Sequence, residues 1–235
     1  MRRILIAIDG PAGSGKSTTA KLVARKLGYI YLDTGAMYRA ITLKALTSHI
    51  DLSNEEEISG LAHNSNIAFL NNDGTSSRGA RIILDGNDMT EKIREEEVTK
   101  NVSLVSSYPG VRKVLVDKQR EIGSQKSCVV EGRDIGTVVF PDADLKFFMI
   151  ADVMERARRR QAELSQSGAE LPILQVVREL KERDMKDSMR EASPLRKADD
   201  AVEIDTTNLT IDEQVEKILS YVGRTIATME EVEKK

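Results

Sequence analysis

The stretch IDGPAGSGKSTTAKLVARKLG, from Ile8 to Gly28, decides the fold of this chain. It follows the short apolar run ILIAI, which begins at Ile4, and it leads into a helical pattern. Residues 10–17 fit the spacing G-x-x-x-x-G-K-[ST], in which backbone N–H groups surround phosphate oxygens at the start of a helix. The strand before the motif and the helix after it are the context that this pattern requires. The sequence therefore predicts a phosphate-binding loop and, with it, the binding of a nucleoside triphosphate.

The loop residues have distinct expected roles. Glycines let the backbone turn its N–H groups inward. Lys16 is expected to reach the β- and γ-phosphates, and the Ser17 hydroxyl is expected to ligate the Mg²⁺ that bridges them. The predicted ATP-binding residues are Gly10, Pro11, Ala12, Gly13, Ser14, Gly15, Lys16, Ser17 and Thr18.

Short apolar runs alternate with amphipathic stretches along the chain. The runs are ILIAI at Ile4, YIYL at Tyr29, CVV at Cys128, LKFFMI at Leu145 and AVEI at Ala201. This alternation predicts an α/β protein, in which helices cover both faces of a parallel sheet and the strands are nearly all apolar. We expect a three-layer fold around this sheet.

Two segments interrupt the alternation. Between Asn64 and Asp88, two strand-like runs and several turn residues predict a small antiparallel insertion, so we expect a lobe at 63–107 within a core of 1–62 and 108–235. The densely charged segment from Asp152 to Arg190 is helical except near SQSGAELP. That interruption predicts a helix, a loop and a second helix.

The composition excludes several classes of protein. The 235 residues are 40% hydrophobic and carry a net charge of −3. This charge gives no overall attraction to nucleic acid or acidic membranes, and four Phe and five Tyr offer little surface for stacking bases. No apolar stretch approaches the ~20 residues of a membrane span. A single cysteine, Cys128, excludes an intrachain disulfide framework. We therefore expect a soluble cytoplasmic protein with no nucleic-acid or membrane partner.

Other proteins with phosphate loops remain to be considered. A GTPase would need an Asn-Lys-x-Asp and an Asp-x-x-Gly motif, and neither occurs in the sequence. A motor or regulatory ATPase would carry an apolar strand that ends in an acidic residue, and CVVEG at Glu131 or FMIAD at Asp152 fits that description. The loop alone leaves this second alternative open.

A second anion site is predicted after the second apolar run. In LDTGAMYRA, Thr34 is placed to cap a helix and Arg39 can clamp a phosphate through its planar guanidinium. The run CVV then delivers Glu131, Arg133 and Asp134 at its carboxyl end, which is the edge where ligands bind in open α/β sheets. A solvated loop between strands is the alternative interpretation.

The charged segment carries two groups of arginines. Arg183, Asp187 and Arg190 are spaced at i, i+4 and i+7, which puts them on one face of a helix. The run from Arg156 to Arg160 contains four arginines in five residues. Arginines that converge on transferring phosphates would stabilise charge, and a lid that carries them would exclude water. A salt-bridged solvent face is the alternative, which we favour for Arg158.

Five ordered motifs together resemble the bacterial cytidylate kinases, a family of nucleoside monophosphate kinases. They are DGPAGSGKST, LDTGAMYR, YPGVR, EGRDIGTVVFPDAD and KERDMKDSMREASPL, and the resemblance runs to about Tyr221. It implies transfer of the γ-phosphoryl group of ATP to CMP or dCMP with Mg²⁺. It also implies that the inserted lobe closes over the monophosphate and that the Arg-rich helices form the lid over ATP, at about 154–172.

The resemblance also implies residue roles. Ser103, Arg112 and Asp134 would read the cytosine; Arg183 and Asp187 would hold the sugar; Arg39, Arg133 and Arg190 would hold the acceptor phosphate, in a pocket lined by Thr34 and Tyr38. The expected catalytic residues are Lys16, Arg133, Arg156, Arg160 and Arg190, where Arg156 and Arg160 are preferred because they share one helix face.

Elementary chemistry agrees with the base-reading role. Cytosine offers an N4 amino donor to a carboxylate such as Asp134, whereas uracil would face it with O4 lone pairs. No general base is needed, because the second pKa of a phosphate monoester is about 6 and the acceptor oxygen is already ionised. Two alternatives stay open: a kinase of UMP, AMP or a non-nucleotide acceptor, and an ATP-binding regulator without transfer chemistry. We expect a monomer.

Overall fold

The fold is described from a computed structural model that covers residues 3–70, 81–124, 127–166, 168 and 170–233. Five strands form one parallel sheet in the order β2 (Ile30–Asp33), β6 (Cys128–Gly132), β1 (Leu5–Asp9), β7 (Leu145–Ile150) and β8 (Val202–Asp205). Each strand falls on one of the predicted apolar runs. The predicted parallel α/β sheet is therefore confirmed.

Burial on both faces explains why β1 is apolar from Leu5 to Ile8. Leu5 and Ala7 point into the core cluster on one face, while Ile6 and Ile8 point into the cluster on the other. Because side chains alternate along a strand, every position of β1 meets a helix layer. All five residues of β1 are buried, so its sequence lacks the polar alternation of a half-exposed strand.

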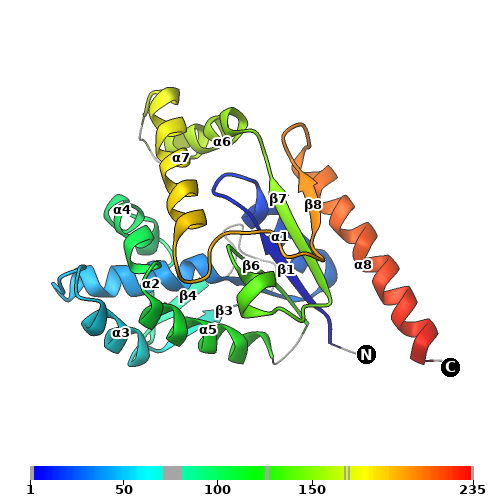
Figure 1. Ribbon diagram of the computed structural model, residues 1–235, viewed down its shortest axis with the longest axis horizontal. Coiled ribbons are helices and arrows are strands. Elements are labelled where there is room, and N and C mark those ends of the chain that lie inside the picture. The colour runs from blue at the N-terminus through cyan, green and yellow to red at the C-terminus, as the bar shows by residue number, and fades with distance from the viewer. Residues whose placement is uncertain (1–2, 71–80, 125–126, 167, 169, 234–235) are drawn as a thin grey trace.

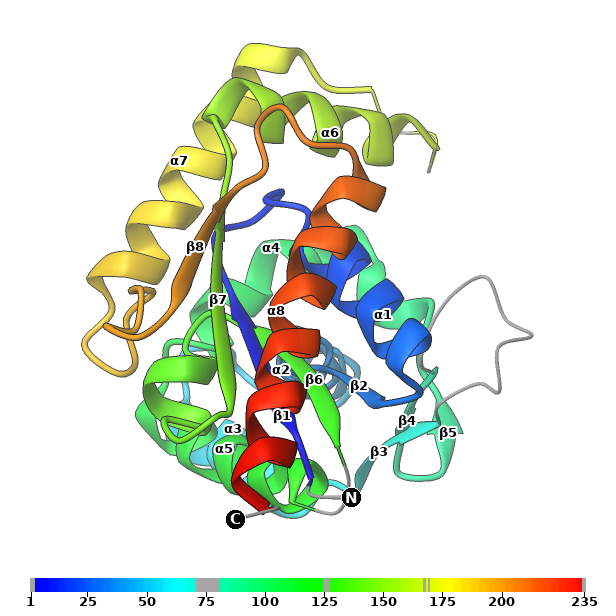
Figure 2. The same ribbon diagram turned by 90° about the vertical axis from the view of Figure 1, so that its right-hand side faces the viewer.

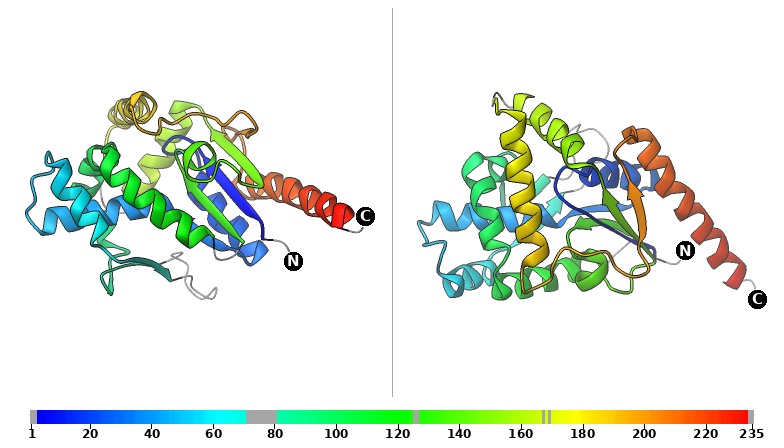
Figure 3. Two further views of the ribbon diagram at one scale, coloured as in Figure 1. Left: turned by 60° about the horizontal axis from the view of Figure 1, so that its bottom comes forward. Right: turned by 45° about the horizontal axis from the view of Figure 1, so that its top comes forward.

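Two helix layers sandwich the sheet. The helices α1 (Lys16–Leu27) and α8 (Ile211–Glu233) lie side by side on one face (Figure 2). The other face is covered by α2 (Thr34–Thr47), α3 (Glu55–His63), α4 (Glu96–Val105) and α5 (Pro109–Gly123) (Figure 3). Among the residues that the structure describes, no helix combines the length and hydrophobicity needed to cross a membrane.

The predicted antiparallel insertion is also present. The strands β3 (Ile67–Leu70), β4 (Arg81–Leu84) and β5 (Asn87–Asp88) pair antiparallel and are followed by the 3-10 helix η1 (Lys92–Arg94). Residues 71–80 of the expected lobe lie outside the described residues. Ile67, Ile82 and Leu84 pack in the same apolar cluster as α2 and α5. The domain division at 62/63 and 107/108 stays a prediction.

The charged segment forms the predicted pair of helices, α6 (Val153–Gln166) and α7 (Ile173–Met189). Figure 1 shows both beyond the carboxyl ends of the strands. They bury a small apolar cluster of their own, made of Ala157, Val176 and Leu180, against which Ala12 of the glycine-rich loop packs. The helix pair thus has a small apolar cluster of its own beside the loop and contributes to neither main core.

Candidate active site

The glycine-rich loop bends tightly between β1 and α1. Gly10 has φ 152°, and a side chain there would place its Cβ 2.2 Å from the carbonyl oxygen of Met149. Gly15 has φ 87° and stands before the first residue of α1, where its Cβ would lie 2.8 Å from Gln214 Oε1. Only glycine fits these positions. No side chain caps α1 and its first turn has no acidic residue, so the helix dipole favours an anion at this end.

Two polar groups of the loop are arranged for an anion. Ser14 is fully buried, and among the described residues its Oγ has no hydrogen-bond partner. Lys16 is 6% exposed, and its Nζ donates a hydrogen bond of 3.3 Å to the carbonyl oxygen of Pro11. Burial, followed by repulsion from Arg133 and Arg183, lowers the pKa of Lys16 to about 8. Glu131 and Asp33 act on this pKa in the opposite direction, and a bound phosphate would add further negative charge beside the ammonium.

Ser17 is oriented by a buried carboxylate. Its hydroxyl donates a hydrogen bond of 2.8 Å to Glu131, and Tyr31 donates one of 2.5 Å to the other oxygen of the same carboxylate. Glu131 is 2% exposed; burial and the neighbouring Asp33 raise its pKa. This contact arises because β6 pairs with β1, which sets Glu131 opposite Ile8 at the entrance to the loop.

One cavity of about 460 Å³ connects the loop to the predicted acceptor residues. It lies at the carboxyl edge of the sheet, as expected for a ligand site in this class of fold. The predicted residues that line it are Ala12, Gly13, Lys16, Ser17, Thr18, Thr34, Tyr38, Arg39, Arg112, Arg133, Asp134, Arg160, Arg183, Asp187 and Arg190. The structure therefore brings most of the predicted donor and acceptor residues to a single site.

The arginines of the cavity repel one another. Burial and the surrounding cations, among them Arg133 and Arg160, lower the pKa of both Arg39 and Arg183 to about 10. Both groups stay charged at neutral pH. Among the described residues the Nε atom of Arg183 has no hydrogen-bond partner, although it is buried. Like charges held this close favour a polyanionic ligand, which would relieve their repulsion.

A buried ion pair stands at the other end of the cavity. The Nη2 atom of Arg112 donates a short hydrogen bond to Asp134, and Arg190 Nη2 lies 3.8 Å from the other carboxylate oxygen. The side chains of Arg112 and Asp134 are 4% and 6% exposed. The Arg112 guanidinium lies 5.3 Å from the ring centre of Tyr38. This end thus offers a carboxylate and a guanidinium fixed side by side, which suits a heterocycle that both donates and accepts.

A second ion pair connects the sheet edge to α7. Arg133 donates through Nε to Asp187 at 2.9 Å. Burial opposes ionisation of Asp187, but Arg133 and Arg183 outweigh it and hold the pKa of this carboxyl below its ordinary value. Asp187 therefore stays ionised and can accept hydrogen bonds between the two ends of the cavity.

Some predicted residues stand elsewhere. Ser103 does not line the cavity; its neighbour Val102 and Ser106 do. Arg156 is buried behind the loop, where its Nη1 donates to Ala12 O at 3.2 Å and to Asp184 at 2.7 Å. Arg160 lines the cavity and pairs with the exposed Glu163 at 3.0 Å. Gly10, Pro11, Ser14 and Gly15 shape the loop without lining the cavity.

Two details of the prediction are wrong. Thr34 does not cap α2, because the helix begins at that residue and the Asp33 carboxylate accepts from Ala36 N instead. The Thr34 hydroxyl donates to the carbonyl oxygen of Glu131 at 2.8 Å. Arg190 does not project from the helical face, because α7 ends at Met189 and Arg190 is extended with ψ 141°. It approaches Asp134 from the end of the helix.

Comparison with known proteins shows to which family this chain belongs. A sequence model described as cytidylate kinase matches residues 6–224, which is nearly the whole chain. The chain belongs to the cytidylate kinase family. Cytidylate kinases from Caldanaerobacter subterraneus subsp. tengcongensis and Desulfitobacterium hafniense are 51% and 49% identical to it. The alignments cover 94% and 97% of this chain and 95% and 96% of the relatives.

The fold is shared more widely than the cytidylate kinase sequence. A crystal structure of an uncharacterized protein from Eubacterium ventriosum has a TM-score of 0.51 and 12% identity, over 95% of this chain and 99% of that one. At this identity the likeness concerns the fold alone.

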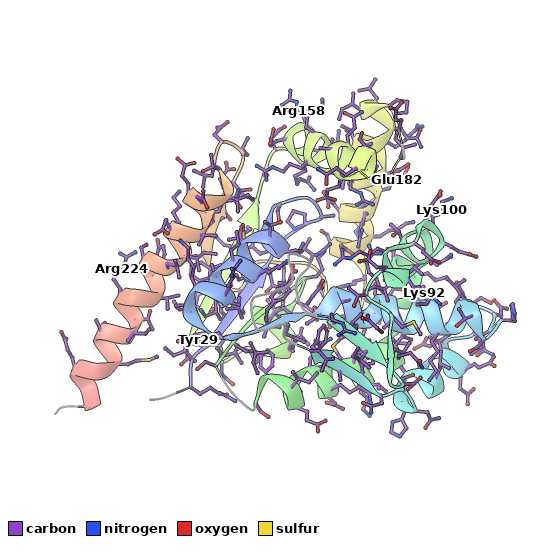
Figure 4. The ribbon with its side chains drawn as sticks, turned by 180° about the vertical axis from the view of Figure 1, so that it is seen from behind. Tyr29, Lys92, Lys100, Arg158, Glu182 and Arg224 are labelled. Carbon is purple, nitrogen blue, oxygen red and sulfur yellow. The ribbon has the colours of Figure 1, made fainter. Side chains whose placement is uncertain are left out.

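Sequence reasoning missed a polar connection in this member of the cytidylate kinase family. Thr206, which follows β8, donates from its hydroxyl to Ser14 O of the loop at 2.9 Å. From α6, Arg159 donates to the Thr206 hydroxyl at 3.1 Å and to its carbonyl oxygen at 2.7 Å. Arg158, the residue before Arg159 in α6, points into solvent (Figure 4) and its side chain is 67% exposed, as its solvent-face interpretation predicts. A polar residue after the last apolar run was the only sequence signal for Thr206.

Proposed function

We propose that this chain transfers the γ-phosphoryl group of ATP to CMP, and to dCMP, and releases ADP with CDP or dCDP. One observation carries the proposal: a single cavity joins the lysine of a phosphate loop, a group of charged arginines and a buried Arg112–Asp134 pair. The loop lysine suits the polyphosphate of the donor, the arginines suit the phosphate of the acceptor, and the Arg112–Asp134 pair suits a polar base. Membership of the cytidylate kinase family supports the same reaction.

The donor phosphates occupy the loop in this proposal. The N–H groups at the start of α1 surround the β-phosphate, and Lys16 neutralises charge that develops on the β- and γ-phosphate oxygens. Because the Lys16 ammonium is buried and already fixed near Pro11, little reorganisation accompanies the reaction.

The loop also suits a divalent cation. One available ligand is the Ser17 hydroxyl, a hard oxygen of the type that Mg²⁺ prefers, which is oriented by the hydrogen bond of 2.8 Å that it donates to Glu131. The described residues contain no cluster of three or more His, Cys, Asp or Glu that could hold a metal ion. Nucleotide phosphates and waters would therefore complete the coordination. When bound, Mg²⁺ neutralises charge on the bridging phosphate oxygens.

The acceptor occupies the remaining cavity. Arg39, Arg133 and Arg190 hold its phosphate, while Arg183 and Asp187 contact the sugar. Thr34 and Tyr38 close the wall of the phosphate pocket. Since the acceptor oxygen is already ionised near neutral pH, these residues contribute alignment and charge neutralisation, and no side chain has to remove a proton.

The base is read by Asp134. Its carboxylate accepts from the cytosine N4 amino group, and Arg112 donates to the acceptor atoms at N3 and O2. Uracil would turn its O4 lone pairs towards the carboxylate, so the pair selects against UMP. In this proposal Ser103 joins the base only when the lobe at 63–107 closes over the acceptor.

The lid helices complete the donor site. α6 and α7 lie outside both main cores and are held beside the loop by a small apolar cluster and by hydrogen bonds from Arg156 and Arg159. In this proposal the two helices move as a unit. We propose that Arg160, and Arg156 once released from Asp184, approach the transferring phosphate as the segment 154–172 closes. Closure also excludes water, which would otherwise hydrolyse ATP. A cytoplasmic location and a monomeric state remain predictions from the sequence.

Transfer of label from γ-³²P ATP tests the proposal. The purified protein is incubated with Mg²⁺ and, in separate reactions, with CMP, dCMP, UMP, AMP or no acceptor. We expect label in CDP and dCDP at a rate well above that for UMP or AMP. A preference for UMP or AMP would identify a kinase with another acceptor. Label that appears only as free phosphate in every reaction would contradict phosphoryl transfer to a nucleotide.

The polar connection behind the loop gives a separate prediction. Thr206→Val keeps the shape of a fully buried side chain but removes the hydroxyl that donates to Ser14 O. A buried carbonyl left without its donor costs about 1–3 kcal/mol, so we expect KM for ATP to rise about tenfold while KM for CMP stays nearly constant. Thr228→Val, on the exposed side of α8, is the matched control. Equal changes in the two KM values would refute a specific role for Thr206 in the donor site.

A further inference from the structure

Asp9 is a buried carboxylate that none of the proposed catalytic roles uses. It ends β1, immediately before the glycine-rich loop, and is 4% exposed. Its Oδ1 accepts a hydrogen bond from Ile135 N at 2.8 Å, and its Oδ2 accepts one from Gly136 N at 2.8 Å. Both oxygens of one carboxylate are thus committed to two successive backbone amides 126 and 127 positions away.

Those two amides begin the turn that carries Asp134. Residues Ile135–Val139 form a single turn of π-helix, η2. The carbonyl oxygen of Asp134 accepts from Val138 N at 2.9 Å and from Val139 N at 3.1 Å, which fixes the turn from inside. No side chain of the turn caps its first amides. Asp9 performs that capping from another strand, so the peptide after Asp134 is held on both sides.

The direction of the Asp134 side chain depends on this turn. Asp134 has φ −145° and ψ 25°, between the extended strand β6 and the helical turn that follows. A rotation of the peptide that joins Asp134 to Ile135 would swing the carboxylate relative to Arg112. Gly136 leaves little room for adjustment, because a Cβ there would lie 3.2 Å from the side chain of Lys146 and 3.4 Å from Asp9 Oδ2.

We propose that Asp9 is a positioning residue for base selection: by capping the turn at Ile135 and Gly136, it aims the Asp134 carboxylate and so sets the preference for CMP over UMP. This inference rests on the proposed function. It assigns to the strand before the phosphate loop a part in reading the acceptor base. Asp9 touches neither nucleotide in this scheme.

The charges around Asp9 make its role dependent on pH. Burial raises the pKa of Asp9 to about 6, and Asp134 and Arg133 act on it in opposite directions. From β7, the stem of Lys146 packs on Gly136 while its ammonium pairs with Asp200. As the pH falls through about 6, Asp9 gains a proton and one oxygen loses its ability to accept from the turn. The discrimination between bases should weaken over that range.

The substitution Asp9→Asn tests the proposal through the ratio of kcat/KM for CMP to that for UMP. Asparagine has nearly the same shape, but its NH₂ group would face a backbone N–H. We expect the ratio to fall about tenfold, the size expected for loss of one charge-assisted hydrogen bond. A smaller folded fraction would lower both kcat/KM values by the same factor, so it would not change their ratio. Asp51→Asn, which alters an exposed carboxylate that caps Ser53 N, should leave the ratio unchanged.

The pH profile separates Asp9 from other titrating groups. For the wild-type protein, the CMP/UMP ratio should decrease as the pH is lowered from 7.5 to 5.5, whereas for Asp9→Asn it should stay flat. The phosphates of the two acceptors titrate alike, with a second pKa of about 6, and cancel in the ratio. If the variant followed the wild-type curve, or kept the wild-type ratio at pH 7.5, the proposal would be overturned.

A measurement without nucleotides completes the test. In the wild-type protein, the amide proton resonances of Ile135 and Gly136 should titrate with a midpoint near the Asp9 pKa of about 6. In Asp9→Asn they should shift and lose that titration. Amides that behave identically in both proteins would contradict the capping. If the wild type phosphorylates neither CMP nor UMP, the proposed function fails first; an active wild type with an unaltered ratio in the variant refutes only the role of Asp9.

Discussion

Lys16→Ala is expected to lower kcat about a thousandfold, the upper range for removing one preorganised donor from a developing oxyanion. The ammonium matters most in the transition state, when charge builds on the bridging oxygen between the β- and γ-phosphates. The fold should be retained. Because burial lowers the pKa of Lys16, its charged form is disfavoured inside the protein, and removal of the group relieves that penalty. Steady-state kinetics and thermal unfolding measure the two effects.

The same helix offers a control. Lys26, at the last turn of α1, pairs with Glu216 at 2.6 Å and its side chain is 50% exposed. Lys26→Ala should leave kcat within twofold of wild type, since solvent screens this exposed ion pair and it lies at the opposite end of α1 from the loop. A kcat for Lys16→Ala close to that of Lys26→Ala would show that the loop lysine does not act on the transferring phosphate.

Asp134→Asn is expected to reduce the CMP/UMP ratio of kcat/KM about a hundredfold, because a polar site loses its discrimination when its acceptor becomes a donor. The amide would oppose the cytosine N4 amino group and donate to uracil O4. Part of the change should therefore be a gain in activity towards UMP. Initial rates over a range of both acceptors, at saturating ATP, give this ratio directly.

The CMP/UMP ratio of kcat/KM is a better measure than the activity with CMP alone, because Asp134 also forms an ion pair with Arg112. Breaking a buried ion pair destabilises a protein by about 3–5 kcal/mol, so a loss of folded protein can imitate a loss of catalysis. Asparagine keeps an oxygen for the guanidinium and limits this effect. Asp142→Asn, an exposed change in the segment after the same turn, serves as the matched control. An unaltered ratio in Asp134→Asn would mean that another residue reads the base.

Much of the fold was predictable from the sequence because its signals are local. The strands of the main sheet are short apolar runs, and α6 and α7 are amphipathic segments separated by Gly168 and Pro172. The phosphate loop is contiguous, so its spacing suffices to find it. Turn and helix spacing indicated several acceptor residues, and the resemblance to cytidylate kinases supplied the others and their roles. The cavity is lined by all of them except Ser103.

The remaining features depend on contacts between distant segments. Glu131 meets Ser17 only because β6 pairs with β1, and the order of strands in a sheet cannot be obtained from periodicity. The sequence does not show that Arg156 and Arg159 have different partners within one arginine run. Those partners, Asp184 and Thr206, are distant in the sequence. The error over Thr34 has a local cause, since Asp33 and Thr34 are both good caps and helix starts are uncertain by a residue or two.

The central claim is that the cytosine lies against Asp134 while the acceptor phosphate faces the donor held by the loop. A crystal structure with CMP and a non-hydrolysable ATP analogue tests it most directly. We expect the N4 amino group within hydrogen-bond distance of the Asp134 carboxylate and an acceptor phosphate oxygen in line with the γ-phosphorus beside Lys16. A cytosine bound away from Asp134, with its phosphate directed away from the loop, would contradict the account.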